Sequence, residues 1–236
     1  MIIIPTMSGA LARTAPAADY RSAVMADSPV SYWRLGEANG TTAVDEVGAY
    51  PGDYSGTFTL GVAGAIAGNT AVSFPGVYGI MIGSPQAALS YSQKCTIEGW
   101  VSRALGTNQI FGFTLSGNYL LGIEWYSDSI YLYCYSGAMY YGYFTANVAG
   151  WHHVALVFDG SLTGNARLAG YLDGSPVALS YVGTAPATLP HSGNLGYFGA
   201  GRGLSFARNT TGVLDELAVY SKALSASRIA AHYAAR

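Results

Sequence analysis

The chain has 236 residues, of which 50% are hydrophobic and 10% are charged, and its formal net charge is −2. No cluster of lysine or arginine is present, which argues against binding to nucleic acid or to an anionic membrane surface, and no apolar run is long enough to cross a membrane. The 31 glycines and 19 tyrosines are typical of an all-β protein, because glycine suits tight turns and tyrosine suits half-exposed strand faces.

Residues 1–19 are interpreted as an N-terminal arm. The stretch begins MIIIP, has no basic segment and is interrupted by Pro5, which argues against a secretion signal. Apolar side chains gain by burial, so we expect the arm to contribute to assembly through Ile2, Ile3 and Ile4. The arm either docks on a neighbouring subunit or folds onto its own domain, and the sequence leaves both arrangements open.

A short helix is expected over about residues 17–26, where Tyr20 and Val24 lie one turn apart. Residues 38–70 are rich in turn signals and are expected to be loop-rich. The alternation of apolar residues predicts short strands at 30–35, 71–74, 79–82, 96–101, 109–115, 151–158 and 168–172, with a hairpin over 120–135 that turns near Ser127-Asp128. Asp173-Gly174 predicts a type I′ turn into a strand at 177–181. Strands this short and evenly spaced favour two packed antiparallel sheets.

The C-terminal segment is predicted to be a strand, a turn and a capped helix. Gly212 opens the strand, and alternation places its side chains on two faces, Leu214, Glu216, Ala218 and Tyr220 on one and Val213, Asp215, Leu217 and Val219 on the other. Ser225 occupies the N-cap position of a helix over about 225–234, with Leu224 and Ile229 at the spacing of a hydrophobic staple.

Four motifs carry a resemblance to a known family. They are SPVSYWRLGE at 28–37, CTIEGWV at 95–101, WHHVALVFDG at 151–160 followed by YLDG at 171–174, and the C-terminal strand and helix. In this order they resemble the laminin G-like, concanavalin A-like lectin/glucanase family, of the kind found in bacteriophage virion surface proteins. The resemblance implies one two-sheet antiparallel jelly-roll domain over residues 20–236, with short N- and C-terminal helices.

The acidic residues are not arranged for glycoside hydrolysis, which needs two carboxylates on one substrate. Glu98 and Glu124 each stand alone in a strand. Asp45-Glu46 and Asp215-Glu216 are adjacent pairs, and neighbours in an extended segment point to opposite faces. The same geometry keeps His152-His153 from chelating one ion. We therefore expect a protein that is not an enzyme.

Calcium is the cofactor that the resemblance implies, and Asp45 and Asp215 are the positions that best match the family's ligands. Asp45 lies in VDEVG rather than in the family's usual loop with several oxygen-bearing side chains. In the alternative interpretation, Asp45 caps its own turn and Asp215 bonds backbone groups. Cys95 and Cys134 are expected to be buried thiols, with a disulfide left open.

Tyrosines supply the candidate ligand or interface surface. Alternation puts Tyr131, Tyr133 and Tyr135 on one strand face and Ile130, Leu132 and Cys134 on the core face. Further candidates nearby are Tyr126, Tyr140, Tyr141 and Tyr143. Such rings suit sugar stacking or a protein interface, or they simply cover the sheet, and all three interpretations remain open.

The favoured function is a non-enzymatic structural protein of a virion surface, either a capsid decoration protein or a tail-associated adhesin. It would be made in the host cytoplasm, and its expected partners are other virion proteins, copies of itself and host cell-surface glycan. The first alternative is a secreted, extracellular carbohydrate-binding module of bacterial origin. A glycan-active enzyme is disfavoured by the missing carboxylate pair.

Overall fold

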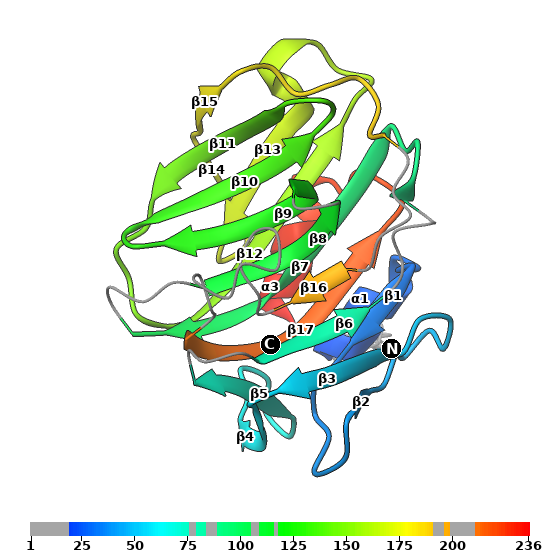
Figure 1. Cartoon of the computed structure of the whole chain (residues 1–236), viewed down its shortest axis with the longest axis vertical. Helices are drawn as coiled ribbons and strands as arrows, with labels where there is room; N and C mark the ends of the chain where they lie inside the picture. Colours follow the sequence, from blue (N-terminus) through cyan, green and yellow to red (C-terminus); the bar gives the residue numbers. More distant parts are fainter. Residues whose placement is uncertain are drawn as a thin grey trace, which may run out of the picture.

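The chain folds as two antiparallel β-sheets packed face to face, as the sequence predicted (Figure 1). The computed structural model describes residues 19–75, 79–83, 89–104, 109–115, 118–190, 196–198 and 211–236. Within these ranges one sheet has eight strands and the other has nine, and we call them sheet A and sheet B. The predicted arm residues Ile2, Ile3 and Ile4 lie outside the described residues.

Sheet A contains the strands that carry the family motifs. Its order is β14-β13-β12-β7-β17-β5-β4, and β1 pairs separately with β17. Strand β1 runs antiparallel to β17, with Tyr32 opposite Ala218. The bounds are β1 Ser31–Trp33, β4 Thr59–Ala63, β5 Thr70–Pro75, β7 Lys94–Arg103, β12 Gly150–Asp159, β13 Leu168–Leu172, β14 Ser175–Val177 and β17 Thr211–Tyr220.

Sheet B has the order β15-β11-β10-β9-β8-β16-β6-β3-β2. The predicted hairpin is present as β9 and β10, with Tyr126 opposite Ser129 across the two-residue turn. The bounds are β2 Thr42–Ala43, β3 Gly52–Gly56, β6 Gly79–Gly83, β8 Gln109–Leu115, β9 Asn118–Tyr126, β10 Ser129–Tyr135, β11 Met139–Thr145, β15 Ser180–Val182 and β16 Gly196–Phe198.

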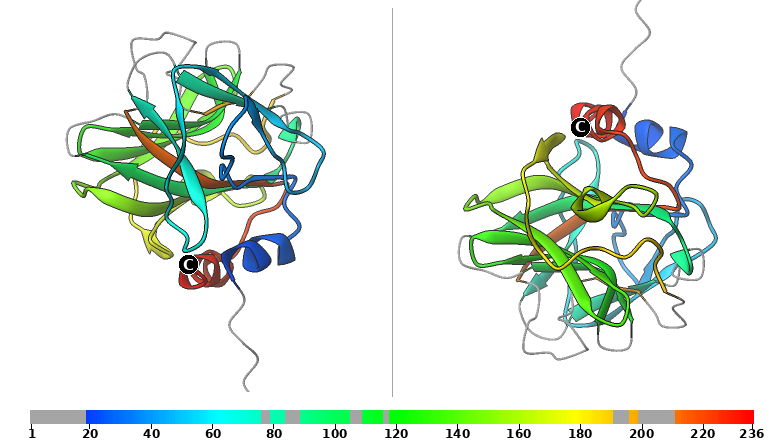
Figure 2. Two further views of the ribbon diagram at one scale, coloured as in Figure 1. Left: turned by 90° about the horizontal axis from the view of Figure 1, so that it is seen from below. Right: turned by 90° about the horizontal axis from the view of Figure 1, so that it is seen from above.

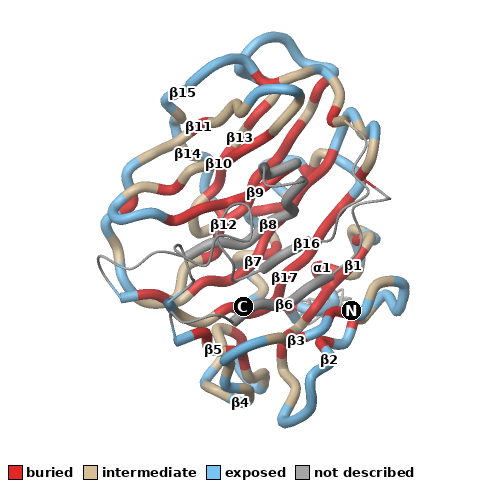
Figure 3. Tube along the Cα trace, in the orientation of Figure 1, coloured by how far each residue is buried: buried red, intermediate tan, exposed pale blue. Residues whose placement is uncertain are grey.

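The main hydrophobic core fills the space between the two sheets (Figure 3). Its largest fully buried side chains include Trp33, Phe74 and Phe158. Cys95 from β7 and Cys134 from β10 also belong to this core, and both are free thiols, as the favoured interpretation of the sequence had it. Burial raises the pKa of both thiols, that of Cys134 to about 12, so they behave as small apolar residues at neutral pH.

Two helices cover the outer face of sheet A (Figure 2). They are α1, Tyr20–Ala26, and α3, Ala226–Ala234. The Ser225 side chain accepts a hydrogen bond from the Arg228 amide and so caps α3, as predicted. Leu224 and Ile229 both enter the apolar cluster beneath the helices, which confirms the expected staple.

Residues 38–70 are loop-rich, as expected, although the short strands β2, β3 and β4 also lie there. One local expectation was wrong. The strand expected at 177–181 is divided: β14 ends at Val177 in sheet A and β15 begins at Ser180 in sheet B. The preceding turn is as predicted, since Asp173 and Gly174 both have positive φ, 49° and 75°. A 3₁₀ helix, η1 Gly164–Arg167, separates β12 from β13.

The predicted alternation of β17 is also wrong beyond Asp215. The register with β7 shifts between Asp215 and Ala218, which is a β-bulge, and Glu216 has a φ of 53°. Because of the extra residue, Leu214 and Leu217 both face the inner core instead of opposite sides. The bulge therefore changes which side chains of β17 meet the helix side of the molecule.

Candidate functional site

Four tyrosine rings pack together on the outer face of sheet B, and we call this surface the tyrosine platform. It consists of Tyr131 and Tyr133 on β10 and Tyr141 and Tyr143 on β11. The ring planes of Tyr131 and Tyr133 lie 13° apart, and those of Tyr131 and Tyr143 lie 19° apart. Tyr141 is tilted by 50–60° against its three neighbours. The rings thus form one contiguous aromatic surface.

The alternation of β10 explains this placement. Ile130, Leu132 and Cys134 enter the core between the sheets, as predicted, so the intervening tyrosines must face outward. The register then brings tyrosines together across the strands, with Tyr131 opposite Tyr143 and Tyr133 opposite Tyr141. Tyr133 is the most enclosed member, at 8% exposure. Cross-strand aromatic pairs of this kind stabilise a sheet.

The remaining candidate tyrosines differ in position. Tyr135 lies opposite Met139 at one end of the platform. Tyr126 is 42% exposed at the other end, where β9 turns into β10. Tyr140 packs against the main core instead, because it is one residue out of phase with Tyr141 and Tyr143. Tyr140 is therefore not part of the tyrosine platform.

A buried carboxylate, Glu124, borders the platform. Glu124 of β9 lies directly opposite Tyr131 and is 1% exposed. Leu121, Ile123 and Trp125 face the core, so Glu124 occupies the platform side of the sheet. A signal for this contact exists in the sequence: a two-residue turn at Ser127-Asp128 fixes the hairpin register and pairs residue 124 with residue 131.

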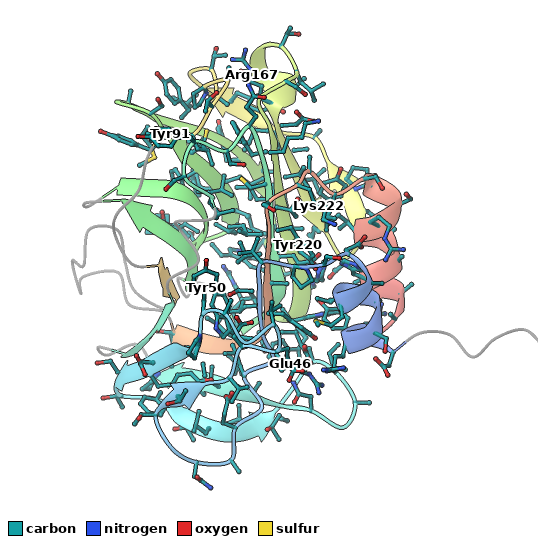
Figure 4. All side chains as sticks on the ribbon, turned by 90° about the vertical axis from the view of Figure 1, so that its right-hand side faces the viewer. Glu46, Tyr50, Tyr91, Arg167, Tyr220 and Lys222 are labelled. Atoms are coloured by element: carbon teal, nitrogen blue, oxygen red, sulfur yellow. The ribbon has the colours of Figure 1, made fainter. Side chains whose placement is uncertain are left out.

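A network of ionisable groups ties the helices to sheet A. Glu98 Oε1 on β7 lies 2.8 Å from His232 Nδ1 on α3 and accepts a hydrogen bond of 2.6 Å from the Tyr220 hydroxyl (Tyr220 is labelled in Figure 4). The other nitrogen of His232 lies 2.8 Å from Asp27 Oδ2. The hydrogen bonds and charges of Glu98 and Asp27 outweigh burial and raise the pKa of His232. The network is buried and structural.

The two adjacent histidines point to opposite faces, as predicted. His153 lies beneath the helices, 3.4 Å from Glu98 Oε2, and packs beside Trp100. His152 lies near Trp125 of the opposite sheet and forms a 2.8 Å ion pair with Asp173, and this contact raises the pKa of His152.

The bulge in β17 brings Asp215 and Glu216 together, against the expectation that adjacent acids diverge. The side-chain amide of Asn69 donates to both carboxylates, at 3.1 and 2.9 Å. Burial and then the charge of Glu216 raise the pKa of Asp215 to about 8, and burial raises that of Glu216, so the pair holds a proton at neutral pH. Both side chains are 0% exposed and are closed to a substrate.

The structure places Asp45 and Asp215 among hydrogen-bond donors. The carboxylate of Asp45 accepts five hydrogen bonds of 2.8–3.1 Å, from the Ser31 hydroxyl and from the backbone amides of Tyr32, Val47, Ala49 and Tyr50. Asp215 accepts from the Ala65 amide at 2.8 Å and from Asn69. N–H groups directed at an oxygen repel a cation, so neither residue has the surroundings of a calcium ligand. Within the described ranges, no three His, Cys, Asp or Glu side chains converge on a metal position.

The fold and the platform together define a lectin-like β-sandwich. The family model of the concanavalin A-like lectin/glucanases superfamily, laminin G type, matches residues 78–230, and the chain belongs to this superfamily. The resemblance to the laminin G-like, concanavalin A-like family is confirmed. A comparison with curated protein sequences finds no match. Among the described residues, no helix has the length and apolar character needed to span a membrane.

Solved structures share the fold at low sequence identity. Domain 4 of AbnA, a GH43 extracellular arabinanase from Geobacillus stearothermophilus solved with arabinotriose, is 18% identical, with a TM-score of 0.65 over 87% of this chain and 98% of that domain. Trypanosoma rangeli sialidase is 18% identical, with a TM-score of 0.62 over 86% of this chain and 32% of its own. The binding domain of botulinum neurotoxin DC, solved with rat synaptotagmin II, is 13% identical, with a TM-score of 0.64 over 88% of this chain and 51% of its own.

Proposed function

We propose that this chain is a non-enzymatic glycan-binding module and that the tyrosine platform is its ligand surface. The observation that carries the proposal is the packing of four tyrosine rings on sheet B, with centroids 5.3–6.2 Å apart. An aromatic face buries the apolar side of a sugar ring, while the phenol hydroxyls can bond sugar hydroxyls at the rim. A contiguous aromatic patch on an outer face is typical of a binding surface.

The platform is also preorganised for binding. Each ring leans on at least two others, so little side-chain entropy remains to be lost when a ligand stacks on the rings. Both described helices cover sheet A, and the platform lies on the other side of the molecule (Figure 2). The arabinotriose complex of the AbnA domain, a relative of similar extent, supports a sugar as the ligand.

We propose that the module has no hydrolytic activity. A glycosidase needs two carboxyl groups roughly 5–10 Å apart across the scissile bond. The strands of the platform hold one carboxylate, Glu124, and the pair that does converge, Asp215 and Glu216, is fully buried on the other sheet. We expect no turnover of glycans that the module binds, measured as reducing ends released over a day.

The proposed setting is the surface of a virion, where the module would act as a decoration protein or adhesin. The motif resemblance supports this setting, and the arm with Ile2, Ile3 and Ile4 would contact other virion proteins or a second copy. Mass spectrometry of purified particles should find the chain, and deletion of residues 1–15 should reduce its attachment. Absence from particles would favour the alternative of a secreted bacterial module.

The platform is tested by variants that remove one ring. Tyr131→Ala should weaken glycan binding about fivefold or more, because a stacked ring contributes roughly 1 kcal/mol or more at a ligand contact. Tyr131→Phe keeps the ring and should retain most of the affinity, which makes it the matched control. Equal affinity of the wild type and the Tyr131→Ala variant on a glycan array, with both proteins folded, would contradict the proposal. Capture of a protein partner that the alanine variant loses would instead assign the platform to a protein interface.

A further inference from the structure

A groove runs between the two helices that cover sheet A. Helices α1 and α3 lie side by side there (Figure 2), and the groove has a volume of about 400 Å³. Ligand pockets commonly have volumes of about 300–1,000 Å³. Most of the lining residues are alanines, of which Ala26 and Ala234 are exposed. We call this surface the helix groove, and its alanines are Ala23, Ala26, Ala231, Ala234 and Ala235.

The packing of the two helices explains why the groove is open. Their large apolar side chains, such as Val24 and Ile229, point toward sheet A and enter the apolar cluster on its outer face. A polar contact joins the helices to each other, because the Arg228 guanidinium donates to Asp27 at 2.7 Å. Alanine side chains reach only a short distance, so none of the described residues fills the space between the helices on the solvent side.

The arm is attached to one wall of this groove. Asp19 is the N-cap of α1, and the lining begins at Ser22, three residues later. An extended chain spans about 3.3 Å per residue, so Ile4 can lie up to about 50 Å from Asp19, whereas the seven residues of α1 span only about 10 Å. The whole groove is therefore within reach, and the attachment gives the arm a high effective concentration at the groove of its own chain.

The arm also has the composition that suits an apolar groove. Among residues 1–18, Arg13 has the only charged side chain, and three isoleucines follow one another at Ile2, Ile3 and Ile4. The small alanines of the groove leave room for branched side chains, and burial of apolar surface favours the contact. The guanidinium on the groove, that of Arg228, is already paired with a carboxylate.

We propose that Ile2, Ile3 and Ile4 occupy the helix groove of their own chain in the free protein. This inference goes beyond the proposed function, because it concerns the arm before a partner takes it up and does not involve the tyrosine platform. The groove then covers an apolar segment that would otherwise be exposed to water.

The test measures disulfide formation in the full chain. Ile3→Cys with Ala234→Cys places one thiol on the arm and one in the groove. Ile3→Cys with Ala138→Cys is the matched control, since Ala138 is exposed in the turn between β10 and β11 of sheet B. In a glutathione buffer the groove pair should form an intramolecular disulfide with an equilibrium constant at least about tenfold above that of the control pair. Peptide mapping distinguishes this disulfide from any that involves Cys95 or Cys134.

A further set of variants isolates the apolar contact. Ile2→Asp with Ile4→Asp, added to the groove pair, should remove its advantage over the control pair, because burial of a carboxylate is costly. Ser8→Asp with Thr14→Asp adds the same charge to the arm outside the three isoleucines and should leave the advantage unchanged.

Each outcome decides the proposal. A monomeric chain with the groove disulfide supports it. A disulfide-linked dimer of the groove pair would mean that the arm enters the groove of a second copy, and equal constants for the two pairs would mean that the arm does not dock there; either result overturns the proposal. Ala26→Cys, on the other wall, replaces Ala234→Cys if that variant does not fold. Glycan binding is measured separately with the Tyr131 variants, so the two proposals fail independently.

Discussion

Asp45 shows how one side chain can organise a long connection. Its two oxygens accept hydrogen bonds from amide groups of the β2–β3 loop and of β1, so the carboxylate holds residues 45–50 against β1. Each amide would otherwise be a donor without an acceptor in a partly buried loop. This role needs an anion with two acceptor oxygens, and it needs no metal.

Asp45→Asn should therefore destabilise the fold by about 2–3 kcal/mol, because the amide places an N–H group against backbone donors. Urea denaturation measures the change. The calcium expected from the family resemblance is tested by thermal denaturation of the same two proteins in the presence of either calcium or a chelator. If calcium raises the melting temperature of the wild type and not of the variant, Asp45 is a calcium ligand after all.

The bulge in β17 changes which side chains of this strand face the core and which face the helices. It fits because its partner strand has Gly99 at the opposite position: a Cβ there would lie 2.4 Å from Cδ2 of Leu217. The missing side chain on β7 thus makes room for the extra residue on β17. The same bulge turns the carboxylates of Asp215 and Glu216 toward Asn69.

Gly99→Ala should lower the free energy of unfolding by about 1–3 kcal/mol, the cost of overpacking a fitted core. Gly99→Ala combined with Leu217→Ala should recover part of this loss, since the second change removes the atom that clashes. Non-additivity in the double-mutant cycle measures the contact. Purely additive losses would show that the glycine has another role.

Some elements could be predicted from local signals and others could not. The β9–β10 hairpin and the α3 cap were predictable, because alternation and turn or cap residues lie within a few positions of each other. β11 was missed because Tyr140 and Phe144 face the core while tyrosines face outward, which leaves no polar alternation. The bulge was missed because its cause, Gly99, is remote in sequence.

The candidate site was partly predictable for the same reason. The tyrosine stripe follows from the strand period, and the Glu124–Tyr131 pairing follows from the hairpin register. The approach of His232 to Glu98 depends on how α3 docks on the sheet, 134 residues away in sequence. No local pattern contains that information.

For the whole molecule, the raised pKa values of buried groups predict that the free energy of unfolding falls as the pH rises. The pKa of His232 is raised above its usual value, so its contribution is present below about pH 6.5 and is lost as the pH rises through the folded value. The pKa of Asp215 is raised to about 8, so stability also falls as the pH rises toward 8 and the proton held by the acid pair is lost. Glu98 has a lowered pKa, because of its two histidines, and its contribution is lost only in strong acid.

The free energy of unfolding should therefore drop by about 1–3 kcal/mol between pH 6 and pH 9, as measured by urea titration at constant salt. His232→Leu should lower stability at pH 6 and flatten the pH dependence. A free energy of unfolding that is constant or rises over this range would show that protonation of His232 and of the acid pair does not stabilise the fold.

The labelling rates of the two buried thiols can report how often the core opens. Cys95 sits in sheet A and Cys134 in sheet B, and each carries a protonated sulfur that a reagent cannot reach while the sheets are closed. The rate of thiol labelling in native buffer then measures how often the two sheets separate enough to admit the reagent. Cys95→Ala leaves Cys134 of sheet B as the thiol that is labelled, and Cys134→Ala leaves Cys95 of sheet A. Equal labelling rates at the two cysteines would mean that the sheets part in a single event, and a faster rate at one would identify the sheet that frays first.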